Sequence, residues 1–243
     1  MHDLILFKRV KTSEFYRCAW SKPNRDKEAP NLTALAAAFE RVTQWIASCV
    51  LVPSSKERAR RIQKLVSVAQ RLLRLNNFHT MMAVLSGLNL NPVGRLKATW
   101  AQIPTSSLVL LEEMRTLMDS KNNFAQYRRA LLQVLEGEGE FGMPFIPVIL
   151  RDIMFSYETL SGDCTVDNVR LMGKQLSVVT ILQGRKVPDD FTVKDSLLHF
   201  FSTITPESDE ETLYQTSVRL EPVGSPPVKS RKSESNSLPR SKP

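Results

Sequence analysis

The stretch that decides the fold runs from residue 144 to residue 158 and reads Pro144-Phe145-Ile146-Pro147-Val148-Ile149-Leu150-Arg151-Asp152-Ile153-Met154-Phe155-Ser156-Tyr157-Glu158. Proline is tolerated in the first turn of a helix, where its missing N–H costs no hydrogen bond, so the two prolines favour a helix start. The apolar side chains expected to form its packing face are Val148, Ile149, Ile153 and Phe155. Arg151, Met154 and Glu158 are spaced i, i+3 and i+7, which places them together on a different face.

A second helical segment is expected after a polar gap. Ser161-Gly162-Asp163 interrupts the apolar pattern, which resumes from about Asp167 to Gln183. Two helices joined by so short a gap predict a helical hairpin whose first arm carries a methionine one turn before a carboxylate. Periodicity alone does not separate a functional hairpin from an ordinary amphipathic helix pair, so the rest of the chain must decide.

Elsewhere the chain alternates helical patterns with short polar breaks and lacks convincing period-2 strands, which predicts an all-α fold. Asn31 is expected to cap a long helix, and Ser54-Ser55 to cap the next. The helices expected outside the hairpin are 4–10, 13–20, 31–51, 56–75, 78–88, 93–100, 104–118, 122–135, 195–204 and 207–219.

Composition excludes several classes of protein. No apolar run reaches the roughly 18 to 20 residues that a membrane span requires, and the apolar part of the N-terminus is too short for a secretory signal. Cys18, Cys49 and Cys164 are far apart and lack a C-x-x-C spacing, so neither a disulfide framework nor a zinc site is indicated. We therefore expect a cytoplasmic protein that holds no metal and no cofactor.

The net charge of +8 invites a nucleic-acid interpretation, but half of it lies in residues 222–243, which hold five basic residues against one glutamate. This Ser/Pro-rich tail has a composition typical of disorder. The remaining charge is spread over the other residues without an aromatic-interleaved basic stripe, so we expect no nucleic-acid partner. The basic tail leaves room for a weak contact with an anionic membrane surface, and so for recruitment to membranes.

Motifs for covalent chemistry are missing from the sequence. The three histidines are isolated, and His79, on an apolar helix, is expected at the edge of the core rather than as a base. Glu112-Glu113 is expected on a solvated helix face, and Glu136, Glu138 and Glu140 in a loop. We therefore expect a protein that is not an enzyme of covalent chemistry and that acts by binding and remodelling another molecule.

Three stretches together resemble one family, the catalytic domain of Ras-type guanine-nucleotide exchange factors. Asn76 to His79, followed by Ser86 to Trp100 (SGLNLNPVGRLKATW), is similar to the family pattern NNF…SALNSSPVxRLKKTW. The run from Asn122 to Arg128 resembles its NFxxYR element, and residues 144–158 resemble its hairpin helix, PFxPxxLxDhxFxxE. Weaker similarities lie around Pro30-Asn31 with Trp45 and in residues 213–222. The matches keep their order over roughly residues 4–222, which makes coincidence a poor explanation.

The resemblance implies a bowl-like bundle of helices that grips switch 2 of a small GTPase while a protruding hairpin levers switch 1 away. The residues it places against the GTPase are Met82, Leu88, Asn89, Phe124, Phe145 and Arg151, with Met154 and Glu158 as the residues that promote nucleotide release. The implied partner is a Ras-subfamily GTPase, and the sequence does not decide between Ras, Rap and Ral.

The expected domain covers residues 1–221, with its first helix shortened relative to the family pattern, and the disordered tail covers 222–243. Two functions fit this organisation. One is a nucleotide-exchange factor that accelerates GDP release; the other is a non-catalytic GTPase-binding or adaptor domain that keeps the bowl and does not open switch 1. An unrelated helical scaffold is the third alternative.

Overall fold

The computed structural model describes residues 2–137, 139, 141–162, 166–187, 194–204 and 209–222. Within these ranges the ordered elements are helices, and the one β-type pairing recorded there is an isolated bridge between Asn77 and Met143. The all-α prediction is confirmed. The expected loop residues Glu138 and Glu140 and the tail beyond Pro222 lie outside the described residues.

The helices follow the predicted order, mostly within three residues of the expected bounds. They are α1 His2–Arg9, η1 Thr12–Ser21, α2 Arg25–Glu28, α3 Pro30–Val50, α4 Ser55–Arg74, α5 Phe78–Asn89, α6 Asn91–Gly94, α7 Lys97–Trp100, α8 Thr105–Leu117, α9 Lys121–Glu136, α10 Ile146–Gly162, α11 Val166–Gly184, α12 Asp195–Thr203 and α13 Glu210–Leu220. The segment expected as one helix over 93–100 is two short helices, α6 and α7. None of the described helices is long and apolar enough to cross a membrane.

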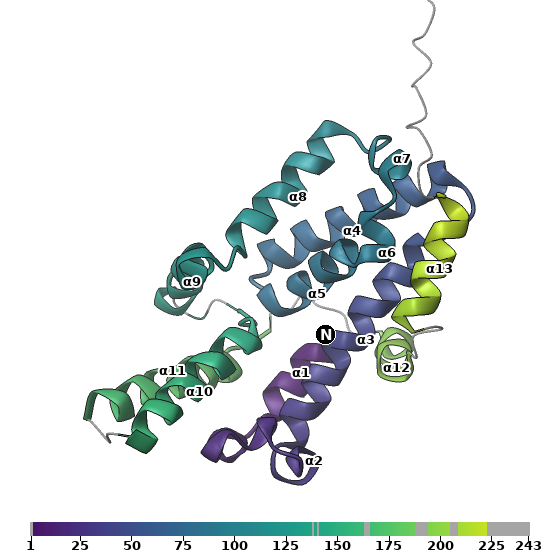
Figure 1. Cartoon of the computed structure of the whole chain (residues 1–243). Coiled ribbons are helices and arrows are strands. Elements are labelled where there is room, and N and C mark those ends of the chain that lie inside the picture. The colour runs from purple at the N-terminus through teal and green to yellow at the C-terminus, as the bar shows by residue number, and fades with distance from the viewer. Residues whose placement is uncertain are drawn as a thin grey trace, which may run out of the picture.

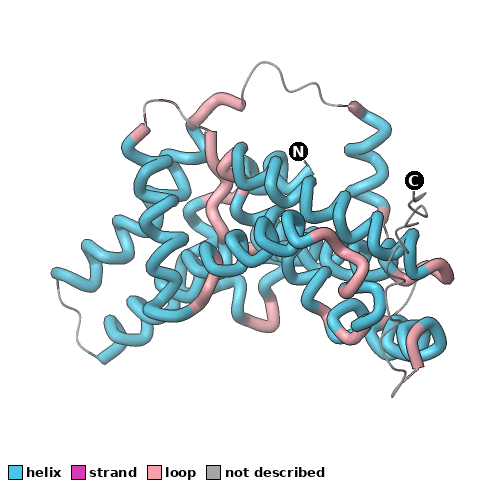
Figure 2. The backbone as a smooth tube through the Cα atoms, turned by 90° about the horizontal axis from the view of Figure 1, so that it is seen from above, coloured by secondary structure: helices cyan, strands magenta, loops and turns pink. Residues whose placement is uncertain are grey.

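The body of the molecule is built around α3 and α5, which pack closely against each other, with α4 on the other side of α5. Figure 1 shows α8 and α9 on one side of this body and α12 and α13 on the other. The α10–α11 hairpin projects from the body near α1 and α9, and Figure 2 shows the helices from above. The core is one continuous cluster to which nearly every helix contributes, from Phe7 of α1 to Leu213 of α13.

The start of α3 corrects one prediction. Asn31 is not the cap of this helix, which begins at Pro30 with proline in its first turn. The backbone N–H groups of Asn31 and Leu32 donate instead to the carboxylate of Glu14, both at 2.9 Å, and Glu14 is buried. Glu14, seventeen residues before Asn31, therefore accepts the hydrogen bonds of N–H groups that a local side chain would otherwise have to satisfy. A cap from so distant a residue cannot be recognised from the local sequence.

The predicted serine cap at the start of α4 is confirmed. The Ser54 side chain accepts a hydrogen bond from the Glu57 N–H at the start of the helix. At its end Asn76 adopts a left-handed backbone with φ of 51°, and Asn77 then caps α5 by accepting from the Thr80 N–H. Asparagine tolerates this conformation better than most residues, so it can end one helix and start the next within two positions.

Candidate functional site

The exposed face of α10 is the most distinctive surface of the hairpin. Arg151 and Glu158 are exposed and Met154 is half-buried, as the i, i+3, i+7 spacing predicts. Phe155, which we expected in the packing face, is 68% exposed, so that prediction was wrong. The buried face is formed by Val148, Ile149, Ile153 and Ser156 instead. Phe155 follows Arg151 by four residues and precedes Glu158 by three, so it shares their face.

The exposure of Phe155 has a simple physical origin. Early α10 residues face the body of the molecule, but the helix continues beyond it with α11 and η1 packed along it. The spacing in the sequence predicts which residues share a face of α10, but it does not predict where the neighbouring helices end and leave that face exposed. A large exposed aromatic side chain beside a methionine and a carboxylate is a typical sign of a contact surface.

The Glu158 carboxylate lies near η1. Burial raises the pKa of the Cys18 thiol of η1, Lys22 opposes the rise, and the negative charge of Glu158 adds to it. Cys18 and its neighbour Arg17 have left-handed backbones, with φ of 55° and 49°. The outer half of α10 is therefore supported by an irregular segment that contacts it from the N-terminal part of the chain.

A row of aromatic rings joins the body to the base of the hairpin. Phe145, immediately before α10, lies with its ring centroid 6.1 Å from Phe39 of α3 and 6.4 Å from Phe124 of α9. The guanidinium carbon of Arg151 stands 5.2 Å above the Phe124 ring. Three of the predicted site residues, Phe124, Phe145 and Arg151, are therefore brought together, although they come from separate parts of the chain.

Phe124 sits in an unusual turn. Asn122, Asn123 and Phe124 all have left-handed backbones, with φ of 50°, 58° and 57°. This conformation is tolerated by asparagine but is rare for a residue as large as phenylalanine and costs about 1 kcal/mol or more. Strain of this kind persists where the surroundings fix it. Here Asn123 accepts hydrogen bonds from Arg128 and Arg151.

Two other predicted residues line a hollow between α5 and α8. Met82 and Asn89 border a hollow of about 190 Å³, together with Leu85, Ser86, Arg115 and Met118. Asn89 and Arg115 also border a larger open depression of about 560 Å³, whose other walls are Gly94, Trp100, Leu108, Val109, Leu111 and Glu112. Val109 is about half exposed there. Trp100, Val109 and Arg115 were not among the predicted site residues, although Trp100 closes the motif SGLNLNPVGRLKATW.

Leu88 and His79, both on α5, are buried in the core. Leu88 is fully buried, so its side chain supports the surface from the core. His79 is 2% exposed rather than at the edge of the core, which corrects the prediction. Its ring lies 5.1 Å from Phe39 and 6.1 Å from Phe145, neither of its nitrogens has a hydrogen-bond partner, and burial lowers its pKa to about 4. A neutral imidazole packed as an aromatic ring explains the arrangement.

Glu112 and Glu113 are exposed on α8, as predicted, and Glu136 is the last residue of α9 rather than part of a loop. Among the described residues no three His, Cys, Asp or Glu side chains come together in a way that could hold a metal ion. The features gathered near the hairpin are thus aromatic, apolar and charged contact groups.

Comparison with known proteins identifies the family of this chain. The family model of the RasGEF domain matches residues 1–175. The chain is 28% identical over 240 residues to Ras guanine nucleotide exchange factor M of Dictyostelium discoideum, covering 96% of this chain and 25% of that protein. It is 28% identical over 238 residues to the mouse Ras-specific guanine nucleotide-releasing factor RalGPS1, covering 93% of this chain and 40% of that protein.

A third relative is Ras-GEF domain-containing family member 1B of Xenopus tropicalis, 30% identical over 210 residues, which are 81% of this chain and 43% of that protein. The chain thus spans less than half of the length of each of these relatives. The family match includes α9 and the aromatic row, and it ends within α11, the second arm of the hairpin. The chain belongs to the RasGEF domain family.

Proposed function

We propose that this chain is a guanine-nucleotide exchange factor for a Ras-subfamily small GTPase. The observation that carries the proposal is the exposed α10 face, where Arg151, Met154, Phe155 and Glu158 stand together on a projecting hairpin of a RasGEF domain. The hollow bordered by Met82 and Asn89 and the aromatic row around Phe145 would grip switch 2, with Leu88 supporting them from the core.

The residue types suit nucleotide release. The thioether of Met154 would place an apolar group where a magnesium ion and a phosphate need polar ligands, so that their bound state loses stability. The carboxylate of Glu158 would repel phosphate and compete for the cationic groups that hold it. No covalent bond needs to form, because the exchange factor acts by stabilising the nucleotide-free GTPase relative to the nucleotide-bound one.

The energy required can be bounded. Accelerating nucleotide release by about 10⁴-fold requires that the barrier to release be lowered by about 5.5 kcal/mol. Because the coupling between two ligands of one protein is reciprocal, incoming GTP weakens the binding of the exchange factor by the same factor by which the exchange factor weakens the binding of GTP. A contact surface of moderate affinity is therefore better suited to turnover than a very tight one.

The decisive measurement is the release of fluorescent GDP from a panel of Ras, Rap and Ral GTPases at micromolar concentrations of this chain. Acceleration on at least one GTPase supports the proposal and also reports which of them is used. Tight binding to a nucleotide-free GTPase without faster release would identify the non-catalytic, GTPase-binding alternative. If the chain neither binds any GTPase of the panel nor accelerates its GDP release, both the exchange function and the GTPase-binding alternative are wrong.

Glu158→Ala is expected to slow the maximal rate of GDP release about tenfold, the loss of about 1.4 kcal/mol of transition-state stabilisation. Its stability should not change measurably, because the side chain is exposed and supports no core. The matched control is Lys174→Ala, an exposed charge on the other arm of the hairpin. An unchanged rate for Glu158→Ala would show that this carboxylate has no part in release.

Phe155→Ala is expected to raise the GTPase concentration needed for half-maximal exchange about fivefold, because truncating an aromatic anchor typically costs a contact surface 1 kcal/mol or more. The midpoint of urea unfolding should stay the same, since the ring is exposed. Leu132→Ala on α9 serves as control, because Leu132 is 55% exposed. Equal behaviour of the two variants would remove Phe155 from the contact surface.

A further inference from the structure

Helix α9 grips the beginning of the hairpin. Tyr127 and Arg128 lie in the regular part of the helix, and Phe124 lies in the left-handed turn just before it, yet all three contact the beginning of the hairpin. Phe124 packs against Phe145 and beneath Arg151. The buried Tyr127 hydroxyl accepts a hydrogen bond of 2.8 Å from the Phe145 N–H, and burial raises its pKa well above the usual range, so the hydroxyl stays protonated.

Arg128 adds an ion pair with α10 itself. Its Nη1 lies 2.7 Å from Oδ2 of Asp152 and its Nη2 donates to Oδ1 at 2.8 Å, a bidentate arrangement. The same guanidinium donates from Nε to the Asn123 carbonyl oxygen at 2.7 Å. The Asp152 side chain is mostly buried, so water screens this pair only partly.

The other root of the hairpin is attached to the opposite end of α9. Arg185, just after α11, donates to the backbone carbonyls of Val134, Leu135 and Gly137. These carbonyls end α9 and have no partner within the helix, so a cation there satisfies them and the helix dipole together. Gln183 of α11 donates in addition to the carbonyl oxygens of Phe7 and Val10.

We propose that α9 is the anchor that fixes the direction of the α10–α11 hairpin, and that Arg128, through its pair with Asp152, is a positioning residue for nucleotide release. This inference rests on the proposed exchange function. A hairpin that must open a partner protein transmits force only if its base does not yield. Two attachment points on one rigid helix, at the two roots of the hairpin, restrict rotation of the hairpin about its base.

The attachment of the hairpin to α9 also explains the left-handed turn at Asn122–Phe124. The turn brings the Asn123 carbonyl oxygen to Arg128 and the Asn123 side-chain oxygen to both Arg128 and Arg151. It also brings the Phe124 ring into contact with Phe145 and with the Arg151 guanidinium. A regular right-handed first turn would direct these groups elsewhere. The strained backbone is maintained by three contacts with the hairpin, which are Asn123 with Arg151, Phe124 with Phe145 and Phe124 with Arg151.

The test compares Arg128→Met, Asp152→Asn and the double variant with the wild-type chain. Each single variant is expected to lower the maximal rate of fluorescent-GDP release about tenfold, while binding to the nucleotide-free GTPase changes less than about twofold. In the Asp152→Asn background Arg128→Met should add little, since both remove one interaction. Arg129→Met is the matched control, because Arg129 is exposed on the same helix and no contact of its side chain is recorded among the described residues.

Amide hydrogen exchange of each chain alone, without a GTPase, gives a second readout. Exchange in α10 and α11 should become faster in Arg128→Met and Asp152→Asn and stay unchanged in α3 and α4. If the hairpin of both variants keeps the wild-type protection against exchange, α9 does not anchor it. The proposal is also wrong if the variants lose as much affinity for the GTPase as they lose rate. Should the wild-type chain release no nucleotide, the exchange function fails, but amide exchange still decides whether α9 anchors the hairpin. Asp152→Asn, which keeps the shape of the side chain, covers the case in which Arg128→Met does not fold.

Discussion

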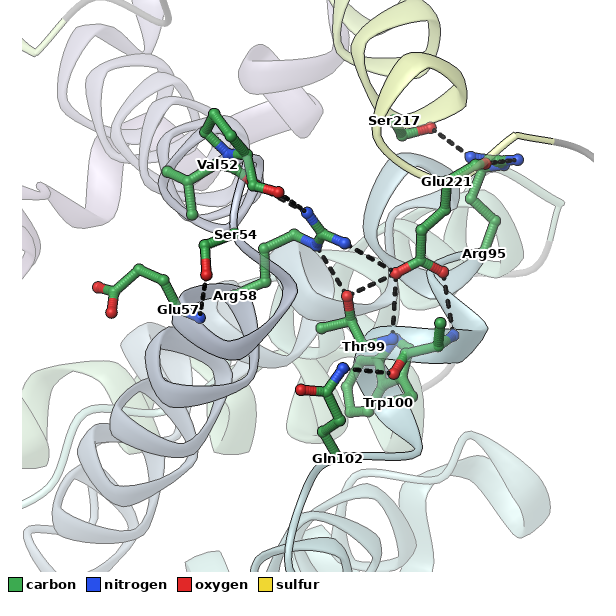
Figure 3. Close-up of polar contacts among 12 residues, drawn as sticks. Val52, Ser54, Glu57, Arg58, Arg95, Thr99, Trp100, Gln102, Ser217 and Glu221 are labelled. Carbon is green, nitrogen blue, oxygen red and sulfur yellow. Dashed lines mark hydrogen bonds and ion pairs between the residues drawn. The ribbon is translucent and has the colours of Figure 1, made fainter. Parts of the chain in front are cut away.

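Replacing Glu221 by alanine is expected to lower the free energy of unfolding by about 3 kcal/mol, because it leaves the guanidinium of Arg58 buried without its counter-charge. Arg58 is 2% exposed and donates to Glu221, to the Thr99 hydroxyl and to the carbonyls of Val52 and Pro53 (Figure 3). Glu221 also accepts from the Thr99 hydroxyl and from the N–H groups of Ala98 and Thr99. A single carboxylate thus joins the end of α13 to α4 and α7.

Urea unfolding measures this effect, and Glu113→Ala, an exposed glutamate on α8, is the control. Burial by itself would raise the pKa of Glu221, but the hydrogen bonds from Thr99, Ala98 and Arg58 and the charge of Arg58 lower it overall. A carboxyl whose pKa is lower in the folded state stabilises the fold above its unfolded pKa and stops doing so as the pH falls through the folded value. The difference between wild type and Glu221→Gln should therefore shrink in acid. A difference independent of pH would show that the charge is not what matters.

Gly87→Ala is expected to destabilise the fold by about 2 kcal/mol, although alanine is the better helix former by about 1 kcal/mol. A Cβ atom at this position of α5 would stand 2.6 Å from the Thr43 carbonyl oxygen and 2.7 Å from Cγ2 of Ile46, both on α3. The nearest of these atoms belongs to the backbone, so the two central helices would have to move apart.

The matched control is Gly173→Ala on α11, where an added Cβ meets nothing within 4 Å. This substitution should raise the stability by about 0.5 to 1 kcal/mol, because the glycine is helical and its backbone freedom in the unfolded chain is reduced. The two glycine substitutions should thus shift the urea midpoint in opposite directions. Equal shifts would mean that the close approach of α3 and α5 relaxes at no cost.

Much of the fold could be predicted from the sequence because it depends on local patterns. Apolar spacing gave the order of the helices, Ser54 marked a helix start, and the hairpin followed from residues 144–158. What could not be predicted depends on contacts between distant segments. Glu14 caps α3 in place of Asn31, His79 lies in the core, and Phe155 is exposed, since each depends on which helix lies opposite.

The candidate site shows the same division. The shared face of Arg151, Met154 and Glu158 follows from helical spacing, and the resemblance to the family supplied the other residues. The pair of Arg128 with Asp152 and the attachment of Arg185 to α9 could not be inferred, because no periodicity connects segments 24 and about 50 residues apart. Phe124, Tyr127 and Arg128 belong to a recognisable motif, but its role at the base of the hairpin becomes visible only in three dimensions.

The link between Arg58 and Glu221 has a consequence for how this domain is made. The two residues lie 163 positions apart in the chain. A ribosome that adds about 5 to 20 residues per second needs roughly 10 to 30 s to pass from one to the other. Throughout that time α4 exists without the anion that lets its arginine enter the core, so this corner of the nascent domain stays hydrated. Closure of this corner of the fold therefore waits for Glu221, well beyond residue 175, where the family match ends.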